Sequence, residues 1–423
     1  MPTLLEILAA RGMLHDATPD LAARLASGPI AGYAGFDPTA DSLHVGNLIP
    51  VMALAWLQRL GGRPIILIGG GTGVIGDPSG KRSERPMMTR ELVAANAERV
   101  GAQLARFLVF GDGPADAIML DNANWLEPLP LLEFLRETGK HFTVNYMLQK
   151  DSVQSRMDSG ISFTEFSYML VQAHDFAHLA AAHDCELQVG GSDQWGNITA
   201  GIELAARRDR RKLHGAVLPL LTTASGAKFG KSESGNIWLD AARTSPYAFH
   251  QFWLQVDDAD VERLLRFMTF LELDEITTLM TAHAERPGER IPHRRLADDV
   301  TGRVHGADAV RRATAAAGIL FGNAELRDAD ADTLAMVSSE VATTPVGVAE
   351  LTQGISIVDA LVSTGLAASK ADARRGLAAG GFSVNGAAVD GQRVLTSADL
   401  LPGGVILLRK GKRSWAAVRA NQG

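Results

Sequence analysis

The chain has 423 residues, of which 46% are hydrophobic and 21% charged, and this composition excludes disordered and collagen-like proteins. The length suggests two to four domains. Lysine and arginine total 41 against 48 aspartates and glutamates, so the formal net charge is −7, and an acidic total argues against a nucleic-acid partner. A single cysteine, Cys185, excludes a disulfide framework and cysteine-cluster metal sites.

The sequence gives no sign of a signal peptide or a membrane span. The N-terminal segment MPTLLEILAARGML lacks a basic n-region and predicts an amphipathic helix. No stretch approaches the roughly 18 apolar residues that a membrane-spanning helix needs. We therefore expect a soluble, cytoplasmic protein.

Residues 30–110 alternate between strand-like and helix-like segments. An apolar run at 30–35 ends in the turn signal Gly35-Phe36-Asp37-Pro38, and helical periodicity follows over 48–60. Ile65-Ile66-Leu67-Ile68 is typical of a buried parallel strand, and a helical stretch covers about 89–107. This rhythm predicts an open parallel sheet with helices on both faces and a ligand at the carboxyl ends of its strands.

The rest of the chain predicts further parts. A strand at 186–189 is followed by two glycines, and the stretch from about 245 to 325 is helical and rich in arginine. Residues 326–352 are rich in Asp, Ala, Thr and Ser and are expected to form a linker. The last 70 residues or so are expected to form a small separate unit.

The segment Gly71-Thr72-Gly73-Val74-Ile75-Gly76 matches the dinucleotide-binding fingerprint and follows a strand. That fingerprint needs its third glycine inside a helix, whereas Asp77-Pro78-Ser79-Gly80-Lys81 predicts a turn here. Lys81 also lacks the upstream glycine and the following Ser or Thr of a P-loop. Both a nicotinamide site and a P-loop are therefore disfavoured.

The segment Asp41-Ser42-Leu43-His44-Val45-Gly46-Asn47 leads into the helix at 48. A helix N-terminus offers free N–H groups to an anion, and a glycine lets a flat ligand approach the backbone. His44 and Asn47 add donors on one face of the first turn. A helix cap with a surface histidine is the simpler explanation of this pattern alone.

Two further patterns carry polar groups. Lys228-Phe229-Gly230-Lys231-Ser232 lies in a Gly- and Ser-rich loop, which can bring two ammonium groups onto a phosphate chain. A solvated basic loop is the simpler explanation of that segment alone. Tyr168, Gln172 and Asp175 have i, i+4, i+7 spacing and share one helix face, which alone suits an amphipathic surface helix.

Together, these segments resemble the HIGH and KMSKS signatures of class I aminoacyl-tRNA synthetases. Over nearly the whole chain the sequence is similar to that of bacterial tyrosyl-tRNA synthetases. The matching segments are YAGFDPTADSLH at 33–44, GDPSGK at 76–81, FSYMLVQAHDF at 166–176 and GGSDQWGN at 190–197. Asn47 stands where the signature usually has a second histidine, and Ala34 where some relatives carry a polar residue; an asparagine still donates a hydrogen bond.

The resemblance implies a fold and a division into domains. A Rossmann-like parallel-sheet catalytic domain would cover 1–222, with a dimer-forming insertion at about 120–165. The KMSKS-type loop and an α-helical anticodon-binding domain would follow over 223–325. The linker 326–352 and a small α+β RNA-binding module over 353–423 would complete a chain that forms a homodimer.

The resemblance also implies a reaction. The enzyme would activate L-tyrosine with ATP to tyrosyl-adenylate and pyrophosphate, then transfer tyrosine to the 3′-terminal adenosine of tRNA(Tyr). Because the tyrosine carboxylate is already ionised at pH 7, no general base is needed, and catalysis depends on alignment and on stabilising phosphate charge. Mg²⁺ would accompany the phosphates, and no tightly bound protein-ligated metal is expected.

By resemblance, the site residues fall into three groups. The catalytic residues would be His44, Asn47, Thr39, Lys228, Lys231 and Ser232. The tyrosine-binding residues would be Tyr33, Asp77, Tyr168, Gln172, Asp175 and Gln194, with Tyr33 and Asp175 at the hydroxyl and Tyr168 and Gln172 at the α-amino group. The ATP-binding residues would be Gly35, Asp37, His44, Gly46, Asn47, Gly191, Asp193 and Lys231.

The C-terminal unit is basic. Residues 356–423 hold nine Lys and Arg against four Asp, so this stretch carries about +5 and the first 355 residues about −12. The total of −7 therefore conceals a footprint suited to a phosphate backbone, although a solubilising surface would have the same charge. The segment ASKADARR at 368–375 predicts a capped basic helix. The expected RNA-binding residues are Lys370, Arg374, Arg375, Arg409, Lys410, Lys412 and Arg413.

Two alternatives stay open. A tryptophanyl-tRNA synthetase would share the fold and both signatures, but Tyr33 and Asp175 favour a substrate with a hydroxyl. A synthetase-like RNA-binding protein without catalysis is the other, and the two loop lysines argue against it. A metal site at His174, His178, His183 and Cys185 is disfavoured because these residues form no complete ligand pattern.

Overall fold

The structure, a computed structural model, describes residues 2–77, 88–150, 153–154, 157, 160–227, 229–232, 235–322, 326 and 329–421. For Lys231 and Ser232 it describes the backbone alone. Contacts between Cα atoms divide the chain into two compact units. The first comprises Met1–Thr244 with Gln255–Leu296, and the second comprises Ser245–Leu254 with Ala297–Gly423.

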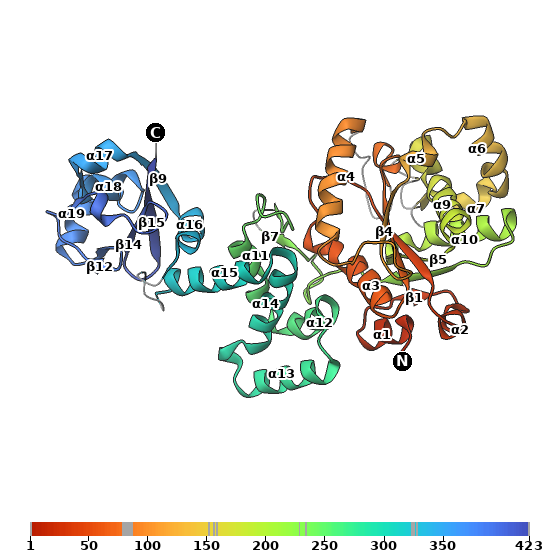
Figure 1. Cartoon of the computed structure of the whole chain (residues 1–423), viewed down its shortest axis with the longest axis horizontal. Helices are drawn as coiled ribbons and strands as arrows, with labels where there is room; N and C mark the ends of the chain where they lie inside the picture. The colour runs from red at the N-terminus through yellow and green to blue at the C-terminus, as the bar shows by residue number, and fades with distance from the viewer. Residues whose placement is uncertain are drawn as a thin grey trace. The chain divides into compact units, whose positions relative to one another are not determined.

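The first unit is built on a six-stranded sheet (Figure 1). Its strands, in spatial order, are β1 (Asp16–Ala17), β6 (His214–Leu218), β5 (Cys185–Gly191), β2 (Ala31–Phe36), β3 (Arg63–Ile68) and β4 (Ile118–Asp121). All neighbours run parallel except β1, which pairs antiparallel with β6 at one edge. The chain builds outward from β2 to β4 and then places β5 and β6 on the other side of β2. The strand order therefore reverses between β2 and β5, where open α/β sheets bind their ligands.

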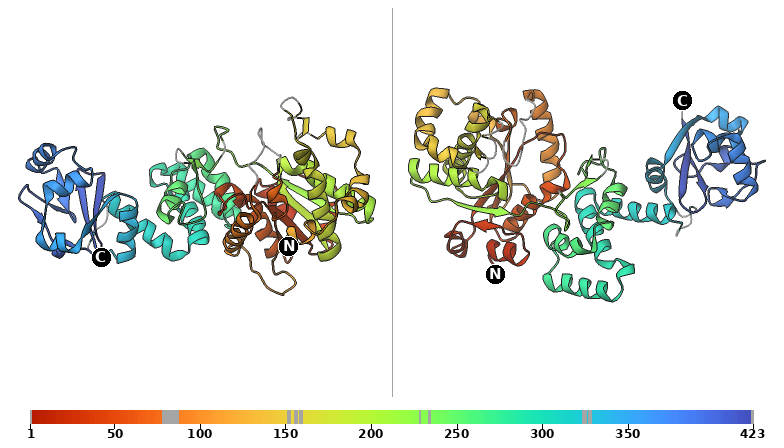
Figure 2. Two further views of the ribbon diagram at one scale, coloured as in Figure 1. Left: turned by 90° about the horizontal axis from the view of Figure 1, so that it is seen from above. Right: turned by 180° about the vertical axis from the view of Figure 1, so that it is seen from behind.

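Helices cover both faces of this sheet, as Figures 1 and 2 show. The helices α3 (Leu48–Arg59) and α4 (Arg90–Leu104) lie on one side, and α9 (Phe163–His183) and α10 (Trp195–Arg208) pack together on the other. Successive side chains of a strand point to opposite faces, and Ile65 and Ile66 in β3 are both fully buried. The apolar run at 65–68 is thus explained by burial on both faces, and the predicted α/β architecture is confirmed.

Shorter elements complete the first unit. The segment that matches the dinucleotide fingerprint forms a 3-10 turn over Thr72–Val74 and does not open the helix that a dinucleotide site needs. A small hairpin is formed by β7 (Lys231–Ser232) and β8 (Gly235–Asn236). The remaining helices are α1 (Leu4–Ala10), α2 (Leu21–Ala26), α5 (Ala123–Leu126), α6 (Leu131–Glu137), α7 (Val144–Leu148), α12 (Asp258–Met268), α13 (Leu273–Glu285) and the first part of α14 (Ile291–His305).

Arg11, at the C-terminal end of α1, joins the two sequence segments of the first unit. Its buried guanidinium donates hydrogen bonds to the carbonyl oxygens of Arg266, Thr269 and Leu271, at and just beyond the end of α12. It also lies 4.4 Å from the centroid of the Trp56 ring in α3. Because the last carbonyls of a helix have no partner within it, this one side chain satisfies groups that burial would otherwise penalise.

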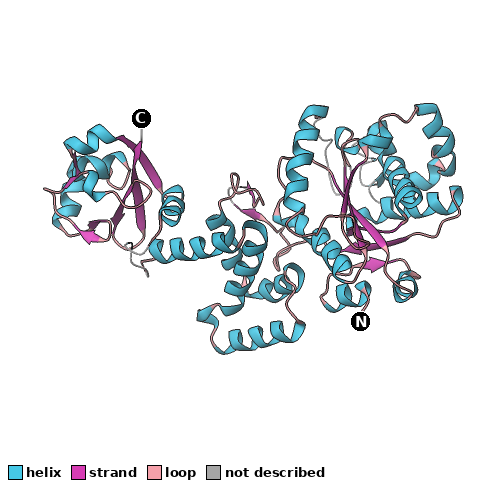
Figure 3. Cartoon of the chain, viewed as in Figure 1, coloured by secondary structure: helices cyan, strands magenta, loops and turns pink. Residues whose placement is uncertain are grey.

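The second unit combines helices with a five-stranded sheet (Figure 3). Its strands, in spatial order, are β12 (Ala387–Ala388), β11 (Phe382–Val384), β14 (Val405–Lys410), β15 (Ser414–Asn421) and β9 (Ala342–Gly347). Only the pair of β15 and β9 within this sheet is parallel. The remaining elements are α11 (Pro246–Leu254), the end of α14, α15 (Ala307–Leu320), α16 (Ala331–Ser339), α17 (Val348–Gln353), β10 (Ile355–Ser356), α18 (Ile357–Ser363), α19 (Lys370–Ala378) and β13 (Val394–Leu395). The predicted C-terminal α+β module is confirmed.

The prediction that residues 326–352 form a linker is wrong, and β14 shows why. Ile406 and Leu408 pack in a core with α18 and α19, whereas Val405 and Leu407 pack in a core with α15 and α16. A strand that is apolar on both faces needs cover on both sides. The supposed linker supplies that cover as α16 and extends the sheet by the edge strand β9.

The helices expected from about 245 to 325 are present as α11–α15, but they are divided between the two compact units. The proposed domain limits, including a helical domain over 223–325, therefore stay a prediction. Among the described residues no helix is both long enough and apolar enough to cross a membrane.

Replacing Arg11 with methionine should destabilise the chain by about 2–4 kcal/mol, because buried carbonyls lose their donor while the apolar stem is kept. Urea denaturation measures this as a lower midpoint. Arg59→Met is the matched control, since Arg59 lies 5.5 Å from the same Trp56 ring centroid. Equal losses in the two variants would show that ring stacking, and not the hydrogen bonds, accounts for the effect.

Candidate active site

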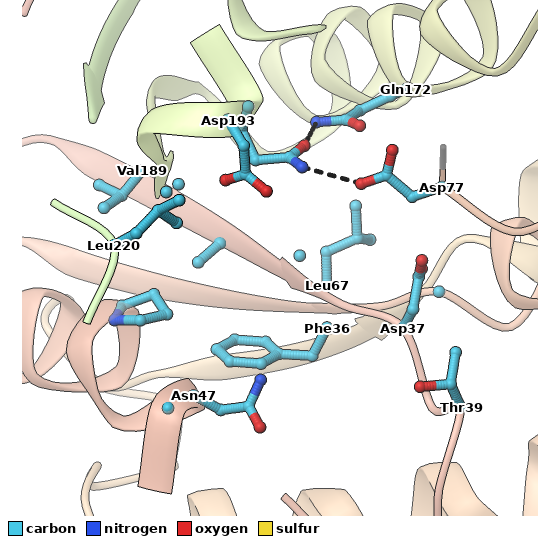
Figure 4. Close-up of a pocket in the computed structure, with 18 of the residues that line it drawn as sticks. Phe36, Asp37, Thr39, Asn47, Leu67, Asp77, Gln172, Val189, Asp193 and Leu220 are labelled. Carbon is cyan, nitrogen blue, oxygen red and sulfur yellow. Dashed lines mark hydrogen bonds between the residues drawn. The ribbon is translucent and has the colours of Figure 1, made fainter. Parts of the chain in front are cut away.

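A cavity of about 610 Å³ lies at the carboxyl ends of β2, β3 and β5, where the strand order reverses (Figure 4). β2 and the turn after it contribute Tyr33 and Asp37, and α9 contributes Tyr168, Gln172 and Asp175. The end of β5 and the turn after it add glycines and polar side chains. The cavity is therefore lined by three strand ends and one helix face, as the sequence predicts for a ligand site.

Asp175 places a buried carboxylate in this cavity. Its side chain accepts hydrogen bonds from Asn122 Nδ2 at 2.9 Å and from Trp125 Nε1 at 2.7 Å. Burial raises the pKa of Asp175 to about 7, while the two donors act in the opposite direction because they stabilise the ionised form. The side chain is thus an acceptor that changes its protonation near neutral pH.

Tyr33 places a hydroxyl in the same cavity. The residue is 1% exposed, and its hydroxyl has no hydrogen-bond partner among the described residues. Its ring packs against Phe176 with a centroid separation of 5.2 Å, and burial raises the pKa of the phenol well above its usual value. A buried hydroxyl without a partner is costly, so this group needs a polar ligand to satisfy it. Tyr33 and Asp175 together offer a donor and an acceptor to one ligand hydroxyl.

Asn122 extends the hydrogen-bond network from Asp175 across the cavity. Its Nδ2 also donates to Thr72 Oγ1 at 3.0 Å, and Thr72 in turn donates to Asp37 Oδ1 at 3.0 Å. Tyr168 donates from its hydroxyl to the other oxygen of Asp37 at 3.4 Å. The carboxylates of Asp175 and Asp37 are therefore held by one continuous set of side chains.

A second network lies near the end of β5. Gln194 donates to Asp77 Oδ2 at 2.8 Å and accepts from Gln172 Nε2 at 3.3 Å, as the dashed lines in Figure 4 show. Asn197 donates to the side-chain oxygens of both glutamines. These amides and the Asp77 carboxylate form a polar wall suited to a charged amino group and its carboxylate.

His44 and Asn47 cap the entrance to α3 reciprocally. His44 Nδ1 accepts from the Gly46 N–H at 3.1 Å, and Asn47 Oδ1 accepts from the His44 N–H at 3.0 Å. Because Nδ1 accepts, a neutral His44 ring carries its proton on Nε2 as a donor. A Cβ on Gly46 would come within 2.9 Å of the His44 ring, so a side chain there would displace that ring. The segment presents donors at a helix entrance, as an anion site requires.

The loop that contains the KMSKS-like segment is held against the His44 segment by backbone hydrogen bonds. Val45 N donates to Ile237 O at 3.0 Å, and Leu239 N donates to Leu43 O at 2.8 Å. Gly230 has φ 80°, and a Cβ there would lie 2.4 Å from Val45 Cγ2. The two signature segments, far apart in sequence, are therefore direct neighbours.

The structure brings together every described pocket residue that the sequence singled out. Lys228 lies outside the described residues, as do the side chains of Lys231 and Ser232. The sequence patterns did not indicate Asn122, Trp125, Thr72 and Asn197; the Asp121-Asn122 pair at the end of β4 was the available signal. The lining residues that were predicted are Tyr33, Gly35, Asp37, Thr39, His44, Gly46, Asn47, Asp77, Tyr168, Gln172, Asp175, Gly191, Asp193 and Gln194.

Two of the histidines considered as metal ligands have packing roles. His174 Nδ1 lies 3.0 Å from Thr138 Oγ1, and burial lowers the pKa of His174 to about 4. The His178 ring stacks on Trp125 with a centroid separation of 4.3 Å. These contacts support the wall that carries Asp175.

The basic residues of the C-terminal module differ in their partners. Lys370 pairs with Asp359 at 2.6 Å, and Arg375 and Lys410 pair with Asp372 at 3.7 and 3.6 Å. Arg409 lies over the Trp415 ring at 5.2 Å. No ion pair within the described part of the chain engages the exposed side chains of Arg374, Lys412 and Arg413.

Comparison with known proteins gives one consistent family. Residues 25–322 match the family model of tRNA synthetases class I (W and Y), and residues 338–418 match the tyrosine–tRNA ligase SYY-like C-terminal domain. A tyrosine–tRNA ligase of Anaeromyxobacter dehalogenans is 58% identical over 420 residues, which span 99% of this chain and all of that protein. The tyrosine–tRNA ligase of Roseiflexus castenholzii is 51% identical over 423 residues, again 99% of this chain and all of the relative.

Solved structures give the same fold. A C-terminally truncated mitochondrial tyrosyl-tRNA synthetase of Aspergillus nidulans superposes with a TM-score of 0.69 at 32% identity, over 76% of this chain and 95% of that one. A tryptophanyl-tRNA synthetase of Encephalitozoon cuniculi superposes with a TM-score of 0.54 at 14% identity, over 73% and 87% of the two chains, and shows the fold alone.

Replacing Trp125 with phenylalanine should raise the pKa of Asp175 further, because the carboxylate loses a donor that favours its ionised form while the stacked ring is kept. Titration of the Asp175 carboxyl by NMR measures the shift directly. Trp195→Phe, on α10, is the control substitution and should leave that titration unchanged. An unaltered Asp175 titration in Trp125→Phe would show that the indole does not stabilise the carboxylate.

Proposed function

The chain belongs to the tyrosine–tRNA ligase family of class I tRNA synthetases, and we propose how its pocket performs that activity. The enzyme activates L-tyrosine with ATP to tyrosyl-adenylate and pyrophosphate, then transfers tyrosine to the 3′-terminal adenosine of tRNA(Tyr). The observation that carries the choice of amino acid is the buried pair of Tyr33 and Asp175. One offers an unpartnered hydroxyl, and the other a carboxylate.

Recognition of the substrate side chain rests on this pair. The tyrosine hydroxyl donates to Asp175 and accepts from Tyr33. Phenylalanine would leave both groups without a partner in a buried site, and that cost provides the discrimination. Asn122 and Trp125 hold the carboxylate in place, and an indole substrate lacks a hydroxyl at the matching position.

The α-amino group and carboxylate of tyrosine lie toward the second network. Gln172 and Asp77 of this network offer side-chain oxygens to the ammonium group, and Tyr168, whose hydroxyl is bonded to Asp37, offers its oxygen from the neighbouring network. Gln194 bridges Gln172 and Asp77, and its amide faces the edge of the bound tyrosine. These contacts hold the carboxylate of the bound tyrosine as the nucleophile. The backbone of that tyrosine sets the direction of attack.

Adenylate formation needs alignment and charge stabilisation. A tyrosine carboxylate oxygen attacks the α-phosphorus of ATP, and the bond to pyrophosphate breaks. His44 Nε2, Asn47 and Thr39 donate to phosphate oxygens, and neutralising the phosphate charge is assigned to Lys228, Lys231 and Ser232, whose side chains lie outside the described residues. Because the nucleophile is already ionised, the site needs no general base, and none of its proposed roles is a proton abstraction.

The remaining pocket residues hold ATP. Gly35, Gly46 and Gly191 allow the nucleotide to lie close to the backbone, and Asp193 receives the ribose hydroxyls. Asp37 lies beside the phosphates, where carboxylates suit a hydrated cation. Mg²⁺ arrives with the substrate as its ATP complex and leaves with pyrophosphate.

The tRNA binds in part through the C-terminal module. Lys370, Arg374, Arg375, Arg409, Lys410, Lys412 and Arg413 form its basic surface. Arg374, Lys412 and Arg413 contribute most, since no described acid engages them and each can neutralise a phosphate. The paired lysines and Arg375 contribute less because their aspartates compete with phosphate.

The chain works as a cytoplasmic homodimer. The predicted insertion at 120–165 exposes large apolar side chains on α6 and α7, between α7 and α9, and at the start of α9, and exposed apolar surface is costly in water. A second copy of the same face covers it with two-fold symmetry. The exposed residues are Leu131, Leu132, Leu135, Val144, Met157 and Phe163.

ATP–pyrophosphate exchange with tyrosine, tryptophan and phenylalanine in parallel tests the substrate. Tyrosine should support the fastest exchange, and Asp175→Asn should lower its kcat/KM roughly 10- to 100-fold because a charged hydrogen bond is lost. In the unaltered enzyme, kcat/KM for tyrosine should fall as the pH drops below about 7, since the carboxylate becomes protonated.

Asp184→Asn is the control for that substitution, because Asp184 is exposed at the end of the same helix in a left-handed conformation that asparagine tolerates. Equal exchange with all three amino acids would contradict the function. Full tyrosine selectivity in Asp175→Asn would contradict the role of Asp175 but not the proposed function.

Combined replacement of Arg374, Lys412 and Arg413 with serine should weaken tRNA binding and reduce the slope of log K against log salt by up to about 3. Pyrophosphate exchange should not change, because none of the three residues lines the pocket. The combined Lys370, Arg375 and Lys410 variant is the matched control and should alter the slope less. Similar slopes in both variants would reject the distinction between paired and unpaired cations.

A further inference from the structure

Three potential metal ligands converge at a junction of helices outside the pocket. Asp258 is the first residue of α12, His283 lies in the last turn of α13, and His293 lies in the first turn of α14. One ligand atom from each lies within 4.8 Å of the others. They form the one such group of His, Cys, Asp and Glu among the described residues.

The separations suit a small tetrahedral cation. His283 Nε2 lies 3.5 Å from Asp258 Oδ2, and His293 Nε2 lies 3.1 Å from Asp258 Oδ1. Zinc–nitrogen and zinc–oxygen bonds of about 2.0–2.2 Å in a tetrahedron place neighbouring ligand atoms about 3.3 Å apart. The two separations run to the two different oxygens of one carboxylate; both are close to that length and longer than a charged hydrogen bond, at about 2.7–2.9 Å.

Burial favours the ligand form of the histidines. His293 is fully buried and His283 is 6% exposed, and the Nε2 atom of each faces the Asp258 carboxylate. The Nδ1 atom of His283 has no hydrogen-bond partner within the described residues. A neutral imidazole is the form that binds a metal.

The ligand atoms of this cluster suit zinc better than a hard divalent cation such as Mg²⁺. Arg290 places Nη1 3.3 Å from Asp258 Oδ1 and holds Val256 O with Nη2 at 2.9 Å. The guanidinium competes for one carboxylate oxygen and leaves Oδ2 facing His283. With two imidazoles and one carboxylate, the donor set suits zinc, while Mg²⁺ would require more oxygen ligands.

We propose that Asp258, His283 and His293 form a zinc-binding site, with a water molecule as the fourth ligand on the exposed side of Asp258. The ion would join the start of α12, the end of α13 and the start of α14 through the two buried imidazoles and the Asp258 carboxylate. None of the three residues lines the active-site cavity, so the proposal is independent of the catalytic function.

Titration of the chelator-treated full chain with Zn²⁺, followed by calorimetry, tests the site. One ion should bind per chain, its affinity should fall at least about tenfold in Asp258→Asn and His283→Gln, and excess Mg²⁺ should not compete. Bound Co²⁺ should show the visible absorption of a tetrahedral site, and Zn²⁺ should raise the melting temperature of the unaltered chain more than that of Asp258→Asn or His283→Gln.

Asp258 is the safest position for the test because its side chain is exposed, so Asp258→Asn should fold even where a buried histidine variant does not. His15→Gln, at an exposed histidine in the same unit, is the control and should bind Zn²⁺ as tightly as the unaltered chain. Absence of saturable binding, or equal affinity in Asp258→Asn and His15→Gln, would overturn the proposal and leave the cluster as an ion-paired helix junction.

Discussion

A carboxylate removed from water must receive hydrogen bonds in exchange, and Asp175 imposes this requirement on the pocket. Its donors, Asn122 and Trp125, follow β4 at the edge of the sheet, whereas Asp175 lies on α9. The sheet must therefore place the end of β4 beside α9 for the carboxylate to be stable. Asn122 also donates to Thr72, which donates to Asp37, so the same hydrogen-bond network fixes the glycine turn after β3. The proposed selectivity for a hydroxyl thus depends on how two distant segments are held as well as on Asp175 itself.

The phosphate side of the pocket is organised by the backbone instead. The loop that carries Lys231 reaches the His44 segment through main-chain hydrogen bonds, which do not depend on the side chains of either signature. This explains how Asn47 can stand in place of a second histidine. Its Oδ1 caps the His44 N–H, a task for which the amide is suited, and the donors of the entrance are kept in position. In this chain the hydrogen bond from the His44 N–H to Asn47 thus holds the segment in place with an asparagine at that position.

The periodicity of apolar and polar residues predicted those features that depend on residues close together in the sequence. The apolar run at 65–68, the helix at 48–60 and the face shared by Tyr168, Gln172 and Asp175 all follow from side-chain periodicity, and the resemblance supplied the pocket residues. Asn122 and Trp125 were missed because only tertiary structure brings them to α9. The stretch 326–352 was misjudged because α16 consists mostly of small and polar residues, and its few large apolar side chains form a buried face only where they pack against β14. The residues of the proposed zinc site share no sequence spacing, since each comes from a different helix.

The net charge of the C-terminal residues likewise shows what composition alone does not predict. The excess of about +5 in residues 356–423 indicates a nucleic-acid partner, but it counts each cation equally. In the structure Asp359 and Asp372 engage three of the seven proposed RNA-binding residues. Asp372 also lies in the first turn of α19, where a carboxylate is favoured by the helix dipole, so these pairs serve the helix as well as neutralising its surface. The proposed RNA-binding residues that these two aspartates do not engage are few, and most of them are exposed. A module of this kind attracts a phosphate chain weakly over its whole surface and strongly at chosen points, which suits a partner that must be held in one orientation by an otherwise acidic enzyme.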